Sequence, residues 1–288
     1  MGLLRTIYHK FLMVLPTRMV LELEHIRVYG KTLNLKEPMY YGEKIQWLKL
    51  YGNLQRYSQY VDKYEVRPYV AEKIGDKYLN ELIGVYDDIE QINFDRLPDR
   101  FVLKVTHGSG YNIICKDKKN LNVQSVKNKL TKWLKEDYSN IKKEAQYSTV
   151  KPRIICEKYI EDGNDDLTDY KIFCFEGEPE FILVNSAISL DKTQDYFDKN
   201  WNRLNLSRKG YKWSKNNDSK PNCLIEMLDV AKKLSAEFPF VRVDLYVVED
   251  KIIFGELTFT PAGGSSLFEP IEEDIKIASK INLDLYKN

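Results

Sequence analysis

A lysine stands inside an apolar, β-branched run and is followed at once by glycines in the stretch FVLKVTHGSGYNIIC. The stretch predicts two strands, 101–106 and 112–117, joined by a loop at the tip of a hairpin. Three residues form this loop: Gly108, Ser109 and Gly110. Their backbone N–H groups could close over phosphate groups while Lys104 contacts the same groups from its strand. The alternative is a lysine on the solvated face of an edge strand, beside ordinary hairpin glycines.

A second set of charged residues lies on a predicted hairpin in FVRVDLYVVEDKIIFGELTFTP. The two-residue period of a strand places Arg242 and Asp244 on one face of the first strand, and Glu256 and Thr258 on one face of the second. If residues 249–251 form the turn, Asp244 lies opposite Glu256 and Arg242 opposite Thr258.

Two carboxylates that face each other across a strand pair repel each other unless a cation lies between them. Magnesium fits, because it prefers one or two carboxylates together with water and phosphate oxygens. Arg242 is then either the counter-ion of these acids or a group that stabilises a phosphoryl group in transfer. The alternative is a solvated face whose charges bind nothing.

Composition narrows the class of protein. The 288 residues carry 44 Lys and Arg against 43 Asp and Glu, so the net charge of +1 does not indicate a nucleic-acid partner. At least three of the four cysteines lie in apolar runs and not in the spaced pairs of a zinc site, which indicates reduced core residues of a cytoplasmic protein. The four cysteines of the chain are Cys115, Cys156, Cys174 and Cys223, and the first three lie in these apolar runs.

The elements that position these residues mix hairpins and helices without a regular βαβ alternation, which predicts an α+β protein. We expect a helical N-terminal segment (1–40), a helical region (41–98), a small sheet-containing lid (99–160) and a C-terminal catalytic part (161–288). The N-terminal segment is a basic amphipathic helix that docks on the body or contacts a membrane or partner. Its apolar face consists of Leu3, Leu4, Ile7, Phe11 and Leu15. No stretch is long and apolar enough for a membrane span.

Histidines offer little for catalysis, because the chain has only three of them. We expect His107, which adjoins the glycine loop, either to support the loop or to contact phosphate or acceptor. His9 and His25 are expected on helix surfaces.

The order of these motifs resembles the ATP-grasp ligases. A lysine strand before a glycine hairpin is followed by ICEKYIEDG, then RVD and GELTFTP. Four further stretches are similar to the TupA-like branch, found among cell-surface polysaccharide and teichuronopeptide genes: KIQWLKLY, VDKYEVRPYV, LPDRFVLKVTHGSGYNIICKDK and DYKIFCFEG. The resemblance covers roughly residues 40–285. It implies two α+β subdomains that grip ATP between antiparallel sheets.

The resemblance also implies roles for individual residues. Lys63 and Lys104 would hold the α and β phosphates, and the glycine loop would close over the triphosphate. The adenine would rest on a hinge formed by three residues: Glu157, Lys158 and Tyr159. Asp169 would reach the ribose, and Lys171 would point towards the phosphates.

On the acidic hairpin, Asp244 and Glu256 would bind Mg²⁺ and Arg242 would stabilise the transferring phosphoryl group. Thr258 stands where the family usually has a metal-binding asparagine, which puts a second Mg²⁺ in doubt. The turn at 261–265 matches the one that shapes the acceptor site in these ligases.

The chemistry implied is the ATP-dependent joining of a carboxylate to an amine, with an amino acid and a uronic-acid glycan as substrates at the inner face of the membrane. Three alternatives stay open. A glycosyltransferase would use a nucleotide sugar, and related gene products often carry that label. A kinase would phosphorylate an alcohol or sugar. A non-catalytic protein would bind ATP without turnover.

Overall fold

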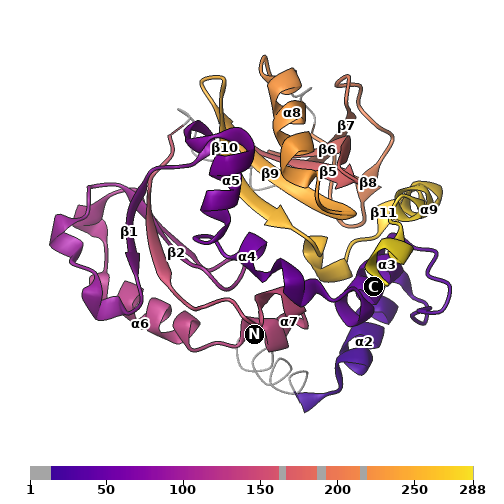
Figure 1. The fold of residues 1–288 in the computed structure, drawn as a ribbon, viewed down its shortest axis with the longest axis horizontal. Coiled ribbons are helices and arrows are strands. Elements are labelled where there is room, and N and C mark those ends of the chain that lie inside the picture. Colours follow the sequence, from indigo (N-terminus) through magenta and orange to yellow (C-terminus); the bar gives the residue numbers. More distant parts are fainter. Residues whose placement is uncertain (1–13, 162–166, 187–192, 215–218, 288) are drawn as a thin grey trace.

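Two antiparallel sheets dominate the structure, a computed structural model that describes residues 14–161, 167–186, 193–214 and 219–287 (Figure 1). The smaller has the order β1-β4-β2-β3 and the larger the order β10-β9-β5-β6-β7. The smaller sheet consists of β1 (Leu82–Tyr86), β2 (Phe101–Val105), β3 (Asn112–Cys115) and β4 (Ile154–Lys158). The larger consists of β5 (Asp169–Phe175), β6 (Glu178–Ser186), β7 (Thr193–Asp198), β9 (Phe240–Val248) and β10 (Lys251–Thr258). The short strands β8 (Ser207–Arg208) and β11 (Phe268–Glu269) pair with each other.

Helices flank both sheets, which confirms the predicted α+β class. The α-helices are α2 (Thr17–Tyr29), α3 (Tyr41–Tyr51), α4 (Ser58–Val61), α5 (Val66–Ile74), α6 (Val123–Leu134), α7 (Tyr138–Lys142), α8 (Leu224–Ser235) and α9 (Ile271–Ser279). The 3₁₀ turns are η1 (Leu54–Tyr57), η2 (Asp76–Tyr78), η3 (Ile89–Gln91), η4 (Phe94–Arg96), η5 (Lys118–Asn120), η6 (Ala145–Tyr147), η7 (Pro261–Gly264) and η8 (Leu283–Tyr286). Within the described ranges, no helix has both the length and the apolar character needed to cross a bilayer.

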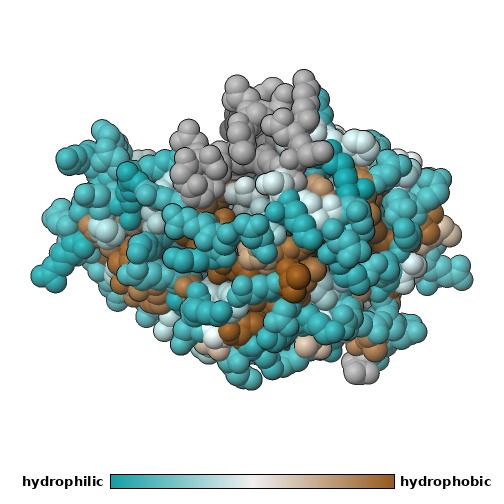
Figure 2. Space-filling view, turned by 90° about the horizontal axis from the view of Figure 1, so that it is seen from above, coloured by the Kyte–Doolittle hydropathy of each residue, from teal (hydrophilic) through white to brown (hydrophobic). Residues whose placement is uncertain are grey.

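Each sheet has its own hydrophobic core. Phe101 and Leu103 of β2 are buried against Leu130 of α6, a helix whose first turn is capped by the side chain of Asn122. The core of the larger sheet also includes apolar residues of α3, α5, α8 and α9. Polar side chains cover most of the face in Figure 2, and apolar ones reach the surface mainly across its middle. The four-part division of the chain stays a prediction.

The described N-terminal helix, α2, packs against α3 and the C-terminal region. The hydroxyl of Tyr29 accepts a hydrogen bond from the Gly42 N–H (2.8 Å) and lies 2.7 Å from the carbonyl oxygen of Ser266, to which it donates. His25 stacks on Tyr29 and is buried, so the expectation that it lies on the helix surface is wrong. The predicted apolar face at Leu3, Leu4, Ile7 and Phe11 lies outside the described residues, as does His9.

The hairpin of β9 and β10 carries the acidic residues, and its register is the one expected. Asp244 pairs with Glu256, and Arg242 pairs with Thr258. The turn differs from the expected three-residue turn, because only residues 249–250 connect the strands and both have positive φ angles. A bulge at Gly255 inserts one extra residue in β10 and restores the pairing that a three-residue turn would have given.

Candidate active site

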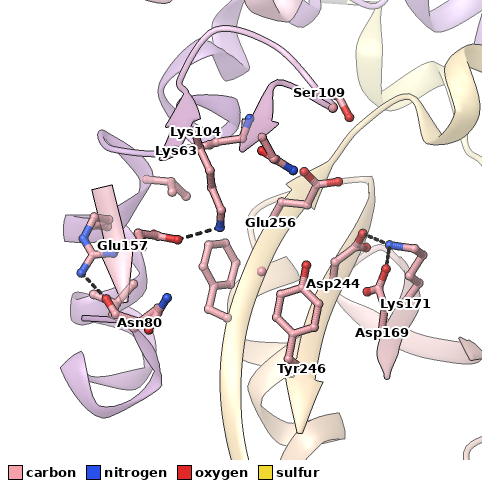
Figure 3. A pocket seen from close by; sticks show the side chains of 17 residues that line it. Lys63, Asn80, Lys104, Ser109, Glu157, Asp169, Lys171, Asp244, Tyr246 and Glu256 are labelled. Carbon is pink, nitrogen blue, oxygen red and sulfur yellow. Dashed lines mark hydrogen bonds and ion pairs between the residues drawn. The ribbon is translucent and has the colours of Figure 1, made fainter. Parts of the chain in front are cut away.

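A cavity of about 280 Å³ lies between the two sheets (Figure 3). The glycine loop, β2 to β5 and the β9–β10 hairpin all contribute to its wall, and the segments 63–67 and 79–80 complete it. Nine of the predicted site residues line it: Lys63, Lys104, Ser109, Gly110, Glu157, Asp169, Lys171, Asp244 and Glu256. The wall thus brings three lysines together with four carboxylates, a composition that suits a phosphate-bearing ligand and a cation.

The glycine loop needs two of its glycines for different reasons. A Cβ at Gly108 would meet the rings of Tyr138 and Tyr111 at 2.8 and 2.9 Å, so close packing excludes a side chain there. Gly110 has a φ of 79°, in the left-handed region that glycine adopts without strain. Lys63 donates a hydrogen bond to the carbonyl oxygen of Gly108 and so ties the loop to the segment between α4 and α5.

His107 supports this loop. Its Nε2 lies 3.0 Å from the carbonyl oxygen of Glu136, and the side chain is buried. Of the two roles expected for His107, the structure therefore favours support of the loop.

On the smaller sheet, Lys104 donates a hydrogen bond of 2.6 Å to Glu157, as Figure 3 shows. Arg67 lies 3.5 Å from the other carboxylate oxygen and donates to the carbonyl oxygen of Asn80 at 2.9 Å. The two cations neutralise Glu157, which is buried. Arg67 and Asn80 also line the cavity, although no motif or periodicity in the sequence assigns them to it.

The other two hinge residues, Lys158 and Tyr159, do not line this cavity. The side chains of Lys158 and Tyr159 line a separate hollow beside Glu81. The N–H of Lys158 donates to the Glu81 carbonyl oxygen (3.0 Å), and its own carbonyl oxygen accepts from the Asn80 side chain (2.9 Å). Their expected part in holding adenine stays a prediction.

Lys171 links the two acids of the larger sheet. Its ammonium lies 2.5 Å from Asp169 Oδ2 and 2.6 Å from Asp244 Oδ2. Burial raises the pKa of Asp169, and Lys171 opposes that shift. The other oxygen of Asp169, Oδ1, is buried and has no hydrogen-bond partner among the described residues. An acceptor left open in the wall of the cavity fits a ligand hydroxyl group, as the resemblance implies for the ribose.

Arg242 holds Asp244 in a two-pronged contact. Its Nε and Nη2 donate to the two oxygens of Asp244, each at 2.6 Å. Burial opposes ionisation of Asp244, but Arg242 and Lys171 outweigh burial and hold the pKa of Asp244 below its usual range. Arg242 Nη2 also donates to Thr258 (3.1 Å) and lies 3.6 Å from Glu256. Arg242 is therefore the counter-ion of the acidic pair in this structure.

The donor set fits Mg²⁺ only in company with phosphate. Among the residues that the structure describes, no group of three or more His, Cys, Asp and Glu side chains could hold a metal ion. Asp244 and Glu256 supply two carboxylates and Thr258 a hydroxyl group, which lies 3.1 Å from Glu256. Mg²⁺ is commonly held by one or two carboxylates plus phosphate oxygens, so these residues could hold it beside a nucleotide.

Tyr246 and Phe254 also line the cavity, and sequence reasoning missed both. Tyr246 follows Asp244 by two residues on β9, so the strand period that placed Arg242 and Asp244 on one face also contained the signal for Tyr246.

A second cavity, of about 970 Å³, adjoins the first. Ser109 and Glu256 line both cavities, so they mark the place where the two meet. Arg242, Thr258 and part of the predicted acceptor turn (261–265) face the second cavity and not the first.

Comparison with solved structures found distant similarity. The D-alanine–D-alanine ligase from Bacillus anthracis, complexed with ATP, is 15% identical with a TM-score of 0.45, and the match covers 82% of this chain and 63% of the ligase. An L-amino acid ligase from Bacillus licheniformis is 11% identical with a TM-score of 0.44, and the match covers 86% of this chain and 56% of that one. The chain thus spans less than two thirds of either protein. Comparison with curated proteins gave no match.

The family comparison is more extensive, because the model of the TupA-like ATP-grasp family matches residues 43–282. The matched segment contains both sheets and every side chain of the first cavity. The resemblance seen in the motifs is confirmed, and the chain belongs to the TupA-like ATP-grasp family.

Proposed function

We propose that the protein is an ATP-dependent ligase that joins a carboxylate to an amine during the synthesis of a cell-surface polysaccharide. One observation carries the proposal. A cavity lined by lysines and carboxylates meets a larger cavity at Ser109 and Glu256. A triphosphate in the first cavity would present its terminal phosphate to a substrate in the second.

The reaction would have two steps. An oxygen of the substrate carboxylate attacks the γ phosphorus, the bond to the bridging oxygen breaks, and ADP leaves with an acyl phosphate formed. The amine then attacks the acyl carbon, loses a proton, and phosphate leaves as the amide forms. Catalysis of this kind consists of positioning and charge neutralisation, so it needs no nucleophilic side chain.

The residues divide the work between the phosphates and the reaction centre. Lys63 and Lys104 neutralise the α and β phosphates, and the glycine loop covers the triphosphate. Asp244, Glu256 and Thr258 would hold Mg²⁺, whose charge would offset that of the phosphates. The remaining roles belong to Lys171 and Arg242, which stabilise the phosphoryl group as it moves.

For the nucleotide, Asp169 takes a ribose hydroxyl group on its unpartnered oxygen. Glu157, Lys158 and Tyr159 form the adenine hinge. For the second cavity we propose an amino acid and a uronic-acid glycan as the substrates, in the cytoplasm at the inner face of the membrane.

The first test is the melting temperature with ATP or ADP, each with and without Mg²⁺. A ligand that binds only the folded state raises stability by mass action, so we expect a rise that depends on Mg²⁺. Lys104→Ala and Glu256→Gln should abolish it, and Lys119→Ala, which removes an exposed lysine of η5, should not.

A positive result leads to a screen of amino acids with uronic-acid glycans for ADP release. A stable phosphorylated product without any amine acceptor would identify a kinase instead. No shift with either nucleotide, together with a shift from a UDP-sugar, would refute the ligase and favour the glycosyltransferase.

A further inference from the structure

The second cavity has an excess of positive charge. Five cationic and three acidic side chains line it: Arg27, Lys49, Lys142, Arg208 and Arg242 against Glu24, Glu144 and Glu256. Two of the cations are already neutralised within the protein. Arg242 is paired with Asp244, and Lys49 lies in the field of Glu144, which opposes the lowering of the Lys49 pKa by burial.

Of the other three cations, Lys142 also lies in the field of Glu144. Among the described residues, none of Arg27, Lys142 and Arg208 forms an ion pair. Arg208 is half-buried and stacks over the ring of Tyr211, with 4.9 Å from the guanidinium carbon to the ring centroid. Cations that converge on one concave wall create a positive potential inside it. Such a wall attracts a negatively charged ligand.

Arg208 lines the same cavity as Arg242 and Glu256. Burial raises the pKa of the buried Tyr41, and both Arg242 and Arg208 oppose that shift. An anion at Arg208 would therefore be part of the same substrate molecule that reaches the junction at Glu256. Two anionic groups on one substrate would then engage the reaction centre and Arg208 at the same time.

Arg27 comes from α2, which precedes the segment matched by the family model. Hydrogen bonds at its C-terminal end hold the helix in place. Tyr29 bonds to Ser266 and Gly42, and Lys209 Nζ lies 3.5 Å from the carbonyl oxygen of Val28. Lys209 is the neighbour of Arg208 in sequence, so α2 and the Arg208 segment form one wall.

We infer that this second cavity binds a substrate with two or more oxyanion groups, one at the reaction centre and another held by Arg27, Lys142 and Arg208. The α2 helix thereby takes part in substrate selection. Guanidinium groups bind carboxylate and phosphate alike through paired hydrogen bonds, so the distal group is one of these. The volume of about 970 Å³ is ample for a sugar, and three tyrosines, Tyr138, Tyr147 and Tyr211, are among the residues that line it. The statement that the bound anion is a substrate rests on the proposed function. The statement that the cavity binds such an anion does not depend on it.

Three sugar acids of similar size separate these chemistries: D-glucuronate has one carboxylate, D-glucarate has two, and D-glucuronate 1-phosphate has a carboxylate and a phosphate. Their dissociation constants are measured by calorimetry on the full-length protein, with Mg²⁺ and a non-hydrolysable ATP analogue at saturating concentration. We expect D-glucarate or D-glucuronate 1-phosphate to bind about tenfold tighter than D-glucuronate, the size of one charge-assisted hydrogen bond. Tighter binding of D-glucarate alone identifies a distal carboxylate, and of the phosphate alone a distal phosphate.

Variants locate the distal group. Arg208→Gln should weaken the binding of the doubly charged sugar acid about tenfold, and Arg27→Gln, which changes an exposed side chain, should weaken it about threefold. The dissociation constant of D-glucuronate should stay unchanged in both variants. Arg18→Gln is the matched control, because it removes an exposed arginine of the same helix that does not line the cavity. Equal affinity for all three acids, no binding of the doubly charged ones, or losses equal to that of Arg18→Gln would overturn the inference.

The same titrations without the nucleotide analogue separate this inference from the proposed function. Absence of nucleotide binding with preserved, arginine-dependent anion binding would refute the ligase and leave the anion site standing. If nucleotide binds with Mg²⁺ but the doubly charged sugar acids bind no tighter than D-glucuronate, the anion site is refuted and the proposed ligase function is left standing.

Discussion

The unpartnered oxygen of Asp169 gives the sharpest test of how a nucleotide would lie in the first cavity. Oδ1 is buried and lacks a hydrogen-bond partner among the described residues, while Oδ2 contacts Lys171 at 2.5 Å. A ribose hydroxyl group that donates to a carboxylate contributes about 1.5–3 kcal/mol, or a factor of about 10–150 in the dissociation constant. Asp169→Ala should therefore raise the dissociation constant of ATP by about that factor. Lys171 retains Asp244 as its partner, so the site should still fold.

The assay is a thermodynamic cycle. The dissociation constants of ATP, 2′-deoxy-ATP and 3′-deoxy-ATP are measured for the wild type and for Asp169→Ala, with Asp284→Ala as a control that removes an exposed carboxylate. In the wild type one deoxynucleotide should bind more weakly than ATP, and in Asp169→Ala that difference should disappear. A coupling energy below about 0.5 kcal/mol for both deoxynucleotides would refute the assignment, because such a value lies within the error of additivity.

Three further changes test the scaffold. Gly255→Ala would place a Cβ 2.9 Å from the Asp244 carbonyl oxygen, so the free energy of unfolding in urea should fall by about 1–3 kcal/mol; an unchanged value would show that the bulge tolerates a side chain. Burial raises the pKa of Asp274 to about 6, above its unfolded value, so this group stabilises the fold at acid pH and loses up to about 3 kcal/mol as pH rises from 4 through 6. The stability difference between wild type and Asp274→Asn should therefore be larger at pH 4.5 than at pH 7.5, and a constant difference would contradict this. Glu157→Gln removes the counter-charge of Lys104, so the free energy of unfolding should fall by about 1–3 kcal/mol and the melting temperature should fall with it. An unchanged free energy of unfolding would mean that the pair is dispensable for stability.

Sequence reasoning named many of the residues that line the first cavity, because strand periodicity and motif order are local signals. The pairing of Asp244 with Glu256 was predicted correctly, although the turn was not. A period of two cannot reveal a bulge, and the isolated glycine at Gly255 was the available signal.

Other features depend on contacts between distant segments, which a helical or strand period does not contain. His25 is buried because Tyr29 stacks on it and because α2 is pinned to α3, about which the spacing within α2 says nothing. The contact of Arg67 with Glu157 likewise joins α5 to β4 across 90 positions of the chain, as the residue numbers show. The second cavity, with walls from α2, β8 and η7, could be assembled only from the folded chain.

The bulge at Gly255 and the two-residue turn at 249–250 compensate each other in strand register, because the bulge adds to β10 the one residue by which the turn is shorter. An insertion of one residue in the turn, by itself, would slide the acids of β9 and β10 out of register, and so would deletion of Gly255. The two changes together leave the pairing of Asp244 with Glu256 intact. In homologous sequences, loss of the glycine should therefore accompany gain of one residue in the turn, so a hairpin with one more turn residue and no glycine is an equivalent solution and not a damaged site.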